Sequence, residues 1–311
     1  MEKRMPLTKK QGFLNKVYDI ISKDQVLCDE PLKEYTSFKI GGPADYLIFP
    51  KTNMQVSRII KLCKQEEMPL FILGNGSNLL VTDEGFRGVV IQLYKSFNTI
   101  TVDQTRIIAQ AGARLSQVAN AAARASLTGL EFASGIPGTL GGAVFMNAGA
   151  YGGEMEQVVR RVTAVDMEGN LFEFTHDELA FAYRHSMLQD RHMIALDVVI
   201  ELQKGDQTEI RRIMFELNKR RKEKQPLEFP SAGSTFKRPE GYFAGKLIMD
   251  SGLAGYRVGD AMVSEKHCGF IINVGEATCS DVLALIEHIQ TVVYAKFQVT
   301  LEREVKVIGE R

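Results

Sequence analysis

The segment from residue 133 to residue 155, ASGIPGTLGGAVFMNAGAYGGEM, contains seven glycines, no basic residue and a single acidic residue, Glu154. Because glycine has no Cβ atom, its backbone N–H groups can approach a bulky ligand closely, and its φ angle turns positive at little steric cost. Such a segment is typical of a site for a large, flat ligand that carries phosphate.

The composition limits the kind of protein that surrounds this segment. The 311 residues are 45% apolar, as expected of a globular chain with two or three domains, and 38 basic residues balance 38 acidic ones. This balance argues against a nucleic-acid or membrane-surface binder. No apolar run approaches the ~18 residues of a membrane span, and the N-terminus lacks the apolar core of a signal peptide. We therefore expect a cytoplasmic protein, and nothing in the sequence indicates an obligate protein partner.

The cysteines and histidines do not indicate a metal site. The four cysteines form no CxxC pair and share no metal-ligand spacing with the five histidines. Free thiols in a reducing compartment are typical of this pattern. We predict neither a metal ion nor a disulfide framework.

The periodicity of apolar residues predicts mixed α and β structure. A helix at 7–21, a strand at 44–50, a helix at 54–67 and a strand at 69–74 indicate a β-α-β unit. Strands at 99–102 and 106–110, a helix at 115–126, a hairpin at 161–174 and a β-rich run at 193–203 form a second block. Beyond about residue 205, two helical stripes around 210–217 and 282–293 flank a strand at 269–274, which predicts a separate α+β domain. Thr278 and Asp281 are predicted to form a capping box at the start of the second of these helices. A last strand at 299–309 is expected to return toward the first domain.

An earlier glycine-rich loop, LGNGSNLLV at 73–81, follows the strand at 69–74 and is called the first glycine loop, whereas the segment at 133–155 is called the second glycine-rich segment. The first glycine loop resembles a G-x-G-x-x-G dinucleotide fingerprint, but Leu79 occupies the sixth position and no amphipathic helix opens there. The loop is either an ordinary turn between strands or a nest of N–H groups for a phosphate. The glycine segment at 133–155, which follows some 55 residues later, favours a pyrophosphate nest. In that segment TLGGAVFMNAG is predicted to form a short helix whose N-terminus faces an anion, although tight packing of a helix on a sheet also explains Gly141 and Gly142.

Five motifs in a fixed order connect the chain with a known family. They are GNGSN at 74–78, GIPGTLGGAVFMNAGAYG at 135–152, YRHS at 183–186, AGSTFKRP at 232–239 and EVKVIG at 304–309. Together they resemble the UDP-N-acetylenolpyruvoylglucosamine reductases, the flavin enzymes of peptidoglycan precursor synthesis. Each motif alone is weak, whereas the ordered set is specific and covers almost the whole chain.

The resemblance implies a fold, a cofactor and a reaction. The fold is α+β, with an FAD-binding region of the vanillyl-alcohol-oxidase (PCMH) type in two subdomains and a C-terminal α+β substrate-binding domain. We expect the first subdomain at 1–97, with 302–311 returning to it, the second at 98–204 and the substrate domain at 205–301. Non-covalent FAD would be reduced by NADPH and would reduce the enolpyruvyl ether of a UDP-sugar to UDP-N-acetylmuramate. The third domain lacks a tyrosine-bearing insertion, as in the shorter subtype of many Gram-positive bacteria. The resemblance therefore leaves open which residues bind the pyrophosphate of the UDP-sugar.

Three residues are implied as catalytic. Hydride addition to the enolpyruvyl group leaves negative charge beside a carboxylate, so the site needs a cation or hydrogen-bond donors and a proton donor. By resemblance, Arg184 holds the carboxylate and the developing enolate, Ser234 donates the proton, and Glu304 is a buried acid that helps to stabilise the intermediate. By residue type alone, Arg184 also fits a surface ion pair, Ser234 a turn after glycine, and Glu304 a solvated edge strand.

Two larger sets of contacts complete the predicted site. The predicted substrate contacts are side chains that can donate hydrogen bonds to a diphosphate and a carboxylate. They are Tyr151, Tyr183, Lys237, Arg238, Arg257 and His267. The predicted FAD contacts are Gly74, Asn75, Gly76, Ser77, Asn78, Leu79, Gly135, Ile136, Pro137, Gly138, Thr139, Gly141, Gly142, Asn147 and Gly149.

Two other functions remain open from the sequence. An FAD-dependent oxidase or dehydrogenase of the same fold would act on an alcohol or hydroxy acid; many such enzymes attach FAD through His or Cys, and residues 64–175 contain neither. A non-catalytic nucleotide-binding module would not need Arg184, Ser234 and Glu304 to converge.

Overall fold

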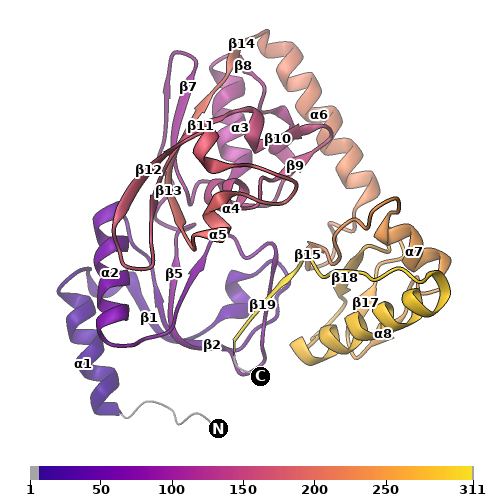
Figure 1. Ribbon diagram of the computed structural model, residues 1–311, viewed down its shortest axis with the longest axis horizontal. Helices are drawn as coiled ribbons and strands as arrows, with labels where there is room; N and C mark the ends of the chain where they lie inside the picture. The colour runs from indigo at the N-terminus through magenta and orange to yellow at the C-terminus, as the bar shows by residue number, and fades with distance from the viewer. Residues whose placement is uncertain (1–6, 310–311) are drawn as a thin grey trace. The chain divides into compact units, whose positions relative to one another are not determined.

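The computed structural model describes residues 7–309 (Figure 1). These residues form two compact units. Within the described range the first unit comprises residues 7–28, 46–75 and 88–219, and the second comprises residues 29–45, 76–87 and 220–309. The chain therefore passes between the units several times. The three-part division with boundaries after residues 97 and 204 stays a prediction.

The N-terminal part of the chain forms the predicted β-α-β unit. Strands β1 (Val26–Pro31), β2 (Pro43–Ile48), β5 (Phe86–Gln92) and β3 (Leu70–Leu73) form a sheet in the order β1-β2-β5-β3. Helix α2 (Asn53–Gln65) connects β2 to β3, and helix α1 (Leu7–Tyr18) precedes them. The hydroxyl of Thr52 caps α2 by accepting a hydrogen bond from the N–H of Gln55 at 3.2 Å. The apolar stripe of α2, which includes Val56, Ile59 and Ile60, is buried in the core of the first unit.

A five-stranded antiparallel sheet forms the rest of the first unit. Its order is β12-β11-β13-β7-β6, with β6 at Ile100–Asp103, β7 at Arg106–Gln110, β11 at Val159–Val165, β12 at Leu171–Thr175 and β13 at Ile194–Glu201. Helices α3 (Leu115–Arg124) and α4 (Leu140–Phe145) pack on this sheet (Figure 1). The predicted hairpin at 161–174 is confirmed, and Gly169 in its turn has a φ of +79°. Short pairs β8 (Leu127–Thr128) with β14 (Gln203–Lys204) and β9 (Gly149–Ala150) with β10 (Gly153–Glu154), and helix α5 (Met187–Asp190), complete the unit.

The second unit combines a four-stranded sheet with two helices. The sheet has the order β15-β18-β17-β16, with β15 at Ser231–Ser234, β16 at Arg257–Val258, β17 at Ala261–Val263 and β18 at Phe270–Asn273. Helix α7 (Ala244–Asp250) and helix α8 (Cys279–Phe297) bury apolar residues in one core with it. The predicted capping box at the start of α8 is present, because Thr278 and Asp281 each accept the backbone N–H of the other. Helix α6 (Gln207–Lys224) runs from the first unit into the second.

The C-terminal segment corrects one expectation. A continuous strand was predicted at 299–309, but only β19 (Lys306–Ile308) forms, in parallel with β4 (Leu79–Val81). The segment changes partner here: the N–H of Glu304 donates to the carbonyl of Thr235 at 2.9 Å, and that of Lys306 donates to the carbonyl of Asn78 at 3.0 Å. A change of partner within three residues interrupts the ladder, so the strand shortens.

Three further findings concern the described residues as a whole. No helix within residues 7–309 is both long enough and apolar enough to cross a bilayer. All four cysteines lie in this range, and none of them forms a disulfide. In the same range no group of three or more His, Cys, Asp or Glu side chains is arranged to hold a metal ion.

Candidate active site

The loop at 74–79 presents a run of unused backbone donors. Among residues 7–309, no group accepts a hydrogen bond from the N–H groups of residues 74–78. Buried or half-buried N–H groups without a partner are rare in folded proteins, and consecutive ones form a concavity that binds anions. Gly76 has a φ of +60°, and a Cβ atom there would lie 2.5 Å from the carbonyl oxygen of Tyr35. The loop therefore requires glycine at this position, and its unused donors suit an anion such as a diphosphate.

Within the first unit the two glycine-rich segments lie side by side. The side-chain amide of Asn75 donates a hydrogen bond to the carbonyl of Pro137 at 2.7 Å. A Cβ atom on Gly74 would lie 2.5 Å from the hydroxyl oxygen of Thr139. Segments 62 or more residues apart in the sequence thus form one surface of bare backbone.

The short helix predicted in the second segment is present as α4, but its N-terminus is largely occupied. The N–H groups of Leu140 and Gly141 donate to the carbonyls of Ala113 and Ala111, each at 2.8 Å. These two donors are therefore not available to an anion, which corrects that expectation. Gly141 is required by the close packing of α4, because a Cβ atom there would lie 2.6 Å from the Cβ of Ala111. Gly142 is exposed, and its added Cβ would make only an ordinary contact of 3.6 Å with Thr139.

Arg184 lies at the tip of a tight turn in the first unit. Ala182 and His185 exchange two backbone hydrogen bonds of 3.1 Å, and Arg184 has a φ of +55°. A non-glycine residue in this left-handed region stores about 1 to 2 kcal/mol, and such strain is common at functional sites. The guanidinium group lies 5.2 Å from the ring centroid of Tyr183 and donates weakly to the carbonyl of Gly149 at 3.5 Å. The structure thus brings Arg184 to the end of the second glycine-rich segment, where Tyr151 is also exposed.

The first glycine loop and the proposed proton donor approach each other within the second unit. Ser234 is exposed at the end of β15, and its neighbour Gly233 has a φ of +77°, with the carbonyl oxygen of Ser77 3.9 Å from its ideal Cβ position. The hydroxyl of Ser37 reaches both segments, at 2.7 Å from the carbonyl of Ser231 and 3.3 Å from that of Gly76. Sequence reasoning missed Ser37, because no local pattern marks a bond to a strand 194 residues away.

Glu304 lies on the segment next to Ser234. Its N–H group donates to the carbonyl of Thr235, and its own carbonyl accepts the side-chain amide of Asn78 at 3.3 Å. Glu304 is half-buried, between the exposed position predicted by the edge-strand alternative and the buried acid implied by the resemblance. The backbone around Ser234 and Glu304 therefore lies beside residues 76–78 in the second unit.

The other basic residues predicted to contact the substrate already interact with side chains of the protein. Lys237 forms an ion pair with Glu302, and Arg257 forms one with Asp260 at 2.6 Å, so both would have to exchange partners to bind an anion. The guanidinium of Arg238 stacks on the ring of Phe243, 4.1 Å from its centroid.

His267 is held in a fixed orientation in the second unit. Its Nδ1 accepts the N–H of Gly269 at 3.2 Å, which leaves the proton of the neutral ring on Nε2. Burial lowers the pKa of His267, so the ring stays uncharged over a wider pH range. A neutral imidazole donates one hydrogen bond but adds no positive charge for a diphosphate.

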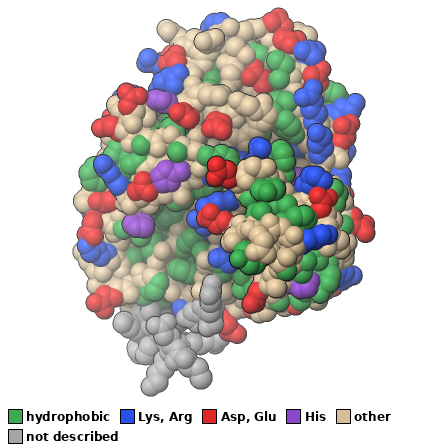
Figure 2. Space-filling model, turned by 45° about the vertical axis from the view of Figure 1, so that its right-hand side comes forward, with side chains coloured by type: hydrophobic (Ala, Val, Ile, Leu, Met, Phe, Trp, Pro, Cys, Tyr) green, Lys and Arg blue, Asp and Glu red, His purple; other side chains and the backbone are tan. Residues whose placement is uncertain are grey.

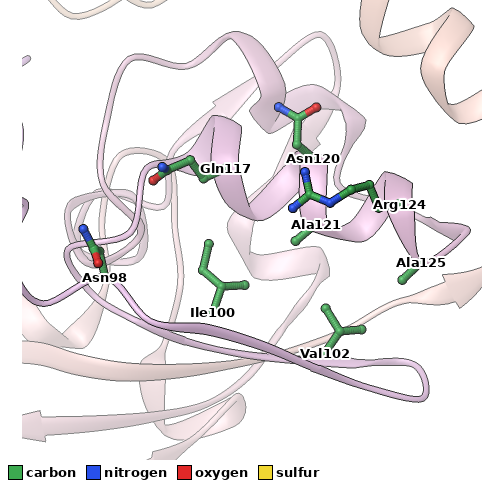
Figure 3. A pocket seen from close by; sticks show the side chains of 8 residues that line it. All are labelled: Asn98, Ile100, Val102, Gln117, Asn120, Ala121, Arg124 and Ala125. Atoms are coloured by element: carbon green, nitrogen blue, oxygen red, sulfur yellow. The ribbon is translucent and has the colours of Figure 1, made fainter.

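One hollow in the first unit is lined by none of the predicted site residues. It has a volume of about 620 Å³ and opens between β6 and α3 (Figure 3). Ile100, Val102 and Ala121 form an apolar floor, and Asn98, Gln117 and Arg124 lie around it. None of its lining residues belongs to the predicted site, and it holds no carboxylate or nucleophile. On the face visible in Figure 2, acidic and basic side chains are interspersed.

Comparisons with known proteins identify the class first. A model of the FAD binding domain matches residues 44–175. The glucose dehydrogenase Phl p 4 shares the fold, with a TM-score of 0.50 at 17% identity over 63% of this chain and 44% of its own. Residues 44–175, which contain both glycine-rich stretches, therefore have a flavoprotein fold of the PCMH type, and an additional α+β region follows them.

More similar proteins define the family. The C-terminal domain model of UDP-N-acetylenolpyruvoylglucosamine reductase matches residues 225–308. Reductases of that name from Clostridioides difficile and Caldanaerobacter subterraneus are 53% and 54% identical, over 96% of this chain and 99% of theirs. The crystal structure of the enzyme from Thermus caldophilus matches with a TM-score of 0.76 at 38% identity, over 91% of this chain and 97% of its own. The chain belongs to the UDP-N-acetylenolpyruvoylglucosamine reductase family.

Proposed function

We propose that this chain is an NADPH-dependent flavoenzyme that reduces UDP-N-acetylglucosamine-enolpyruvate to UDP-N-acetylmuramate for peptidoglycan precursor synthesis. The observation that carries the proposal is membership of the reductase family along nearly the whole chain, including both the FAD-binding and the C-terminal regions. We also propose a cytoplasmic location, because the cysteines are thiols and both proposed substrates are nucleotides of the cytoplasm.

The residues of the first glycine loop fit the diphosphate of FAD. The five consecutive N–H groups at 74–78, which have no acceptor among residues 7–309, supply donors, and Gly76 keeps the loop clear of the side chain that would block it. We propose that residues 74–79 hold the diphosphate and that bare backbone at 135–149 allows the flavin ring to approach. When bound, FAD accepts two electrons from NADPH and supplies the hydride for the substrate.

The chain's own side chains would manage charge and protons. In the overall reaction a hydride adds to the terminal methylene carbon, a proton adds to the neighbouring carbon, and the C=C bond becomes a single bond. We propose that Arg184 binds the carboxylate through its fork of donors and that Ser234 gives up its hydroxyl proton. A serine hydroxyl is a weak acid, so it can protonate only a strongly basic carbanion or enolate. Glu304 is proposed to act beside Ser234, because their segments are joined by the bond from Glu304 N–H to Thr235.

A single titration tests the proposed function. The purified protein should show an oxidised flavin spectrum, and acid precipitation should release the yellow colour into the supernatant. Anaerobic NADPH should bleach the spectrum, and the enolpyruvyl UDP-sugar should restore it with formation of a product two mass units heavier. Bleaching by a simple alcohol or hydroxy acid instead would identify the oxidase alternative. Absence of protein-bound flavin after addition of FAD and removal of the unbound excess would contradict the proposal.

A further inference from the structure

The turn that carries Arg184 is held by an amide side chain from a neighbouring helix. Gln189 lies in α5, and its Nε2 donates to the carbonyl of Arg184 at 3.1 Å and to the carbonyl of Phe145 at 2.8 Å. Phe145 is the last residue of α4, the helix of the second glycine-rich segment. Both neighbours of the amide are carbonyl oxygens, so its nitrogen must face them.

Further bonds fix the same junction. The hydroxyl of Ser186 also donates to the carbonyl of Phe145, at 2.9 Å. The side-chain amide of Asn147 donates to the carbonyl of Ala182 at 3.1 Å, and its oxygen accepts the N–H of Glu156 at 3.0 Å. Asn147 is 1% exposed, so its amide is engaged within the protein. These bonds anchor the start of the turn and the end of α4, while Gln189 bonds the backbone of Arg184 itself.

We infer that Gln189 is a positioning residue for Arg184. Arg184 has a left-handed backbone that is unfavourable for a non-glycine residue, and the direction of its side chain depends on that conformation. Gln189 bonds the carbonyl of this residue and ties it to α4, so it sets where the guanidinium points relative to the second glycine-rich segment. The inference rests on the proposed function of Arg184 as the group that binds the substrate carboxylate.

The test is a double-mutant cycle with a matched control. Gln189→Met keeps the length of the side chain and removes both donated bonds. Gln207 makes the same kind of bridge elsewhere in the first unit, from Nε2 to the carbonyls of Ala123 at 2.9 Å and Arg124 at 3.1 Å. Gln207→Met therefore controls for the general loss of a two-carbonyl bridge. Each change is combined with Arg184→Ala, and NADPH bleaching and reoxidation by the enolpyruvyl substrate are followed separately by stopped flow.

We expect Gln189→Met to slow reoxidation by about tenfold, the effect of about one lost hydrogen bond, while NADPH bleaching keeps the parent rate. In the Arg184→Ala background the same change should slow reoxidation less than twofold further, because the residue it acts through is gone. Calorimetry supplies a readout other than turnover. Gln189→Met should weaken binding of UDP-N-acetylmuramate about tenfold but leave binding of UDP-N-acetylglucosamine, which lacks the carboxylate, unchanged. Gln207→Met should leave all of these quantities within twofold of the parent.

Several results would overturn the inference. Reoxidation of Gln189→Met at the parent rate while Arg184→Ala is slow would overturn it, and so would an equal slowing by Gln189→Met in both backgrounds. Arg184→Ala at the parent rate would refute the role of Arg184 in the proposed function, and this inference with it. If Gln189→Met fails to fold, Gln189→Lys replaces it, because an ammonium group can still donate to both carbonyls. That variant should stay within about threefold of the parent, and a larger loss would contradict the inference.

Discussion

Gly76 offers a sharp test of the diphosphate loop. Gly76→Ala adds a Cβ atom 2.5 Å from the carbonyl oxygen of Tyr35 and 2.8 Å from the Cα of Thr36, at a φ of +60°. The contact with the oxygen must open by about half an ångström before it reaches the shortest separation that real Cβ atoms show. Both obstacles are backbone, which cannot rotate away, so the loop itself must shift.

The size of the effect has two parts. The left-handed φ alone lowers the free energy of unfolding of the alanine variant by about 1 kcal/mol or slightly more. The shift of the loop should also weaken about one charge-assisted hydrogen bond to the diphosphate, worth about 1.5 to 3 kcal/mol. Because 1.4 kcal/mol corresponds to a tenfold change, the Kd for FAD should rise about 10- to 100-fold.

Gly252→Ala provides the matched control. Gly252 lies in the same unit with a φ of +78°, and no atom lies within 4 Å of an added Cβ. It should therefore lose similar stability without losing FAD affinity. The assay is titration of the apoprotein with FAD, followed by flavin fluorescence, alongside thermal melts of both variants. Parent-like FAD affinity in Gly76→Ala would refute the placement of the diphosphate, and equal losses in both variants would show that the effect is one of stability.

Three further predictions concern single side chains. Ser234→Ala should keep NADPH bleaching but slow reoxidation by the enolpyruvyl substrate on the order of a hundred to ten-thousand-fold, with Ser234→Cys less impaired; stopped-flow reoxidation at the parent rate would remove the proposed acid. Burial raises the pKa of Cys63 to about 12, so a thiol reagent at pH 8 should label exposed Cys28 first, and mass spectrometry showing equal rates would contradict this. Burial lowers the pKa of His267 below its unfolded value, so the unfolded chain binds more protons and stability falls as pH drops through about 6.5. His267→Gln should reduce that loss in urea titrations, and an unchanged pH dependence would refute the assignment.

The sequence predicted best those elements whose signals are local. The stripe of α2, the hairpin around Gly169 and the capping box of Thr278 and Asp281 all depend on residues within a few positions of one another. Local periodicity also predicted the C-terminal strand, but it could not predict that the segment would exchange Thr235 for Asn78 as its partner. The length of a strand depends on what lies beside it, and that is decided by distant parts of the chain.

The same reason explains which site residues were missed. The catalytic assignments to Arg184, Ser234 and Glu304 came from motifs, and they stay predictions. Ser37 and Gln189 carry no motif; they emerge only from their bonds to backbone carbonyls. A hydroxyl or amide that bonds a carbonyl elsewhere in the fold looks in the sequence like any other polar residue. Family motifs therefore locate groups that touch ligands more readily than groups that hold those residues in place.

The glycine content of residues 133–155 shows what such a count does and does not indicate. A Cβ atom on Gly141 would lie 2.6 Å from the Cβ of Ala111, and one on Gly153 would lie 2.4 Å from the ring of Phe132. These two glycines are required by packing inside the first unit, whatever ligand is bound. Gly76, by contrast, lies in a loop whose N–H groups have no acceptor among residues 7–309. Unused backbone donors, more than the number of glycines, therefore identify the part of the chain that is built to hold an anion.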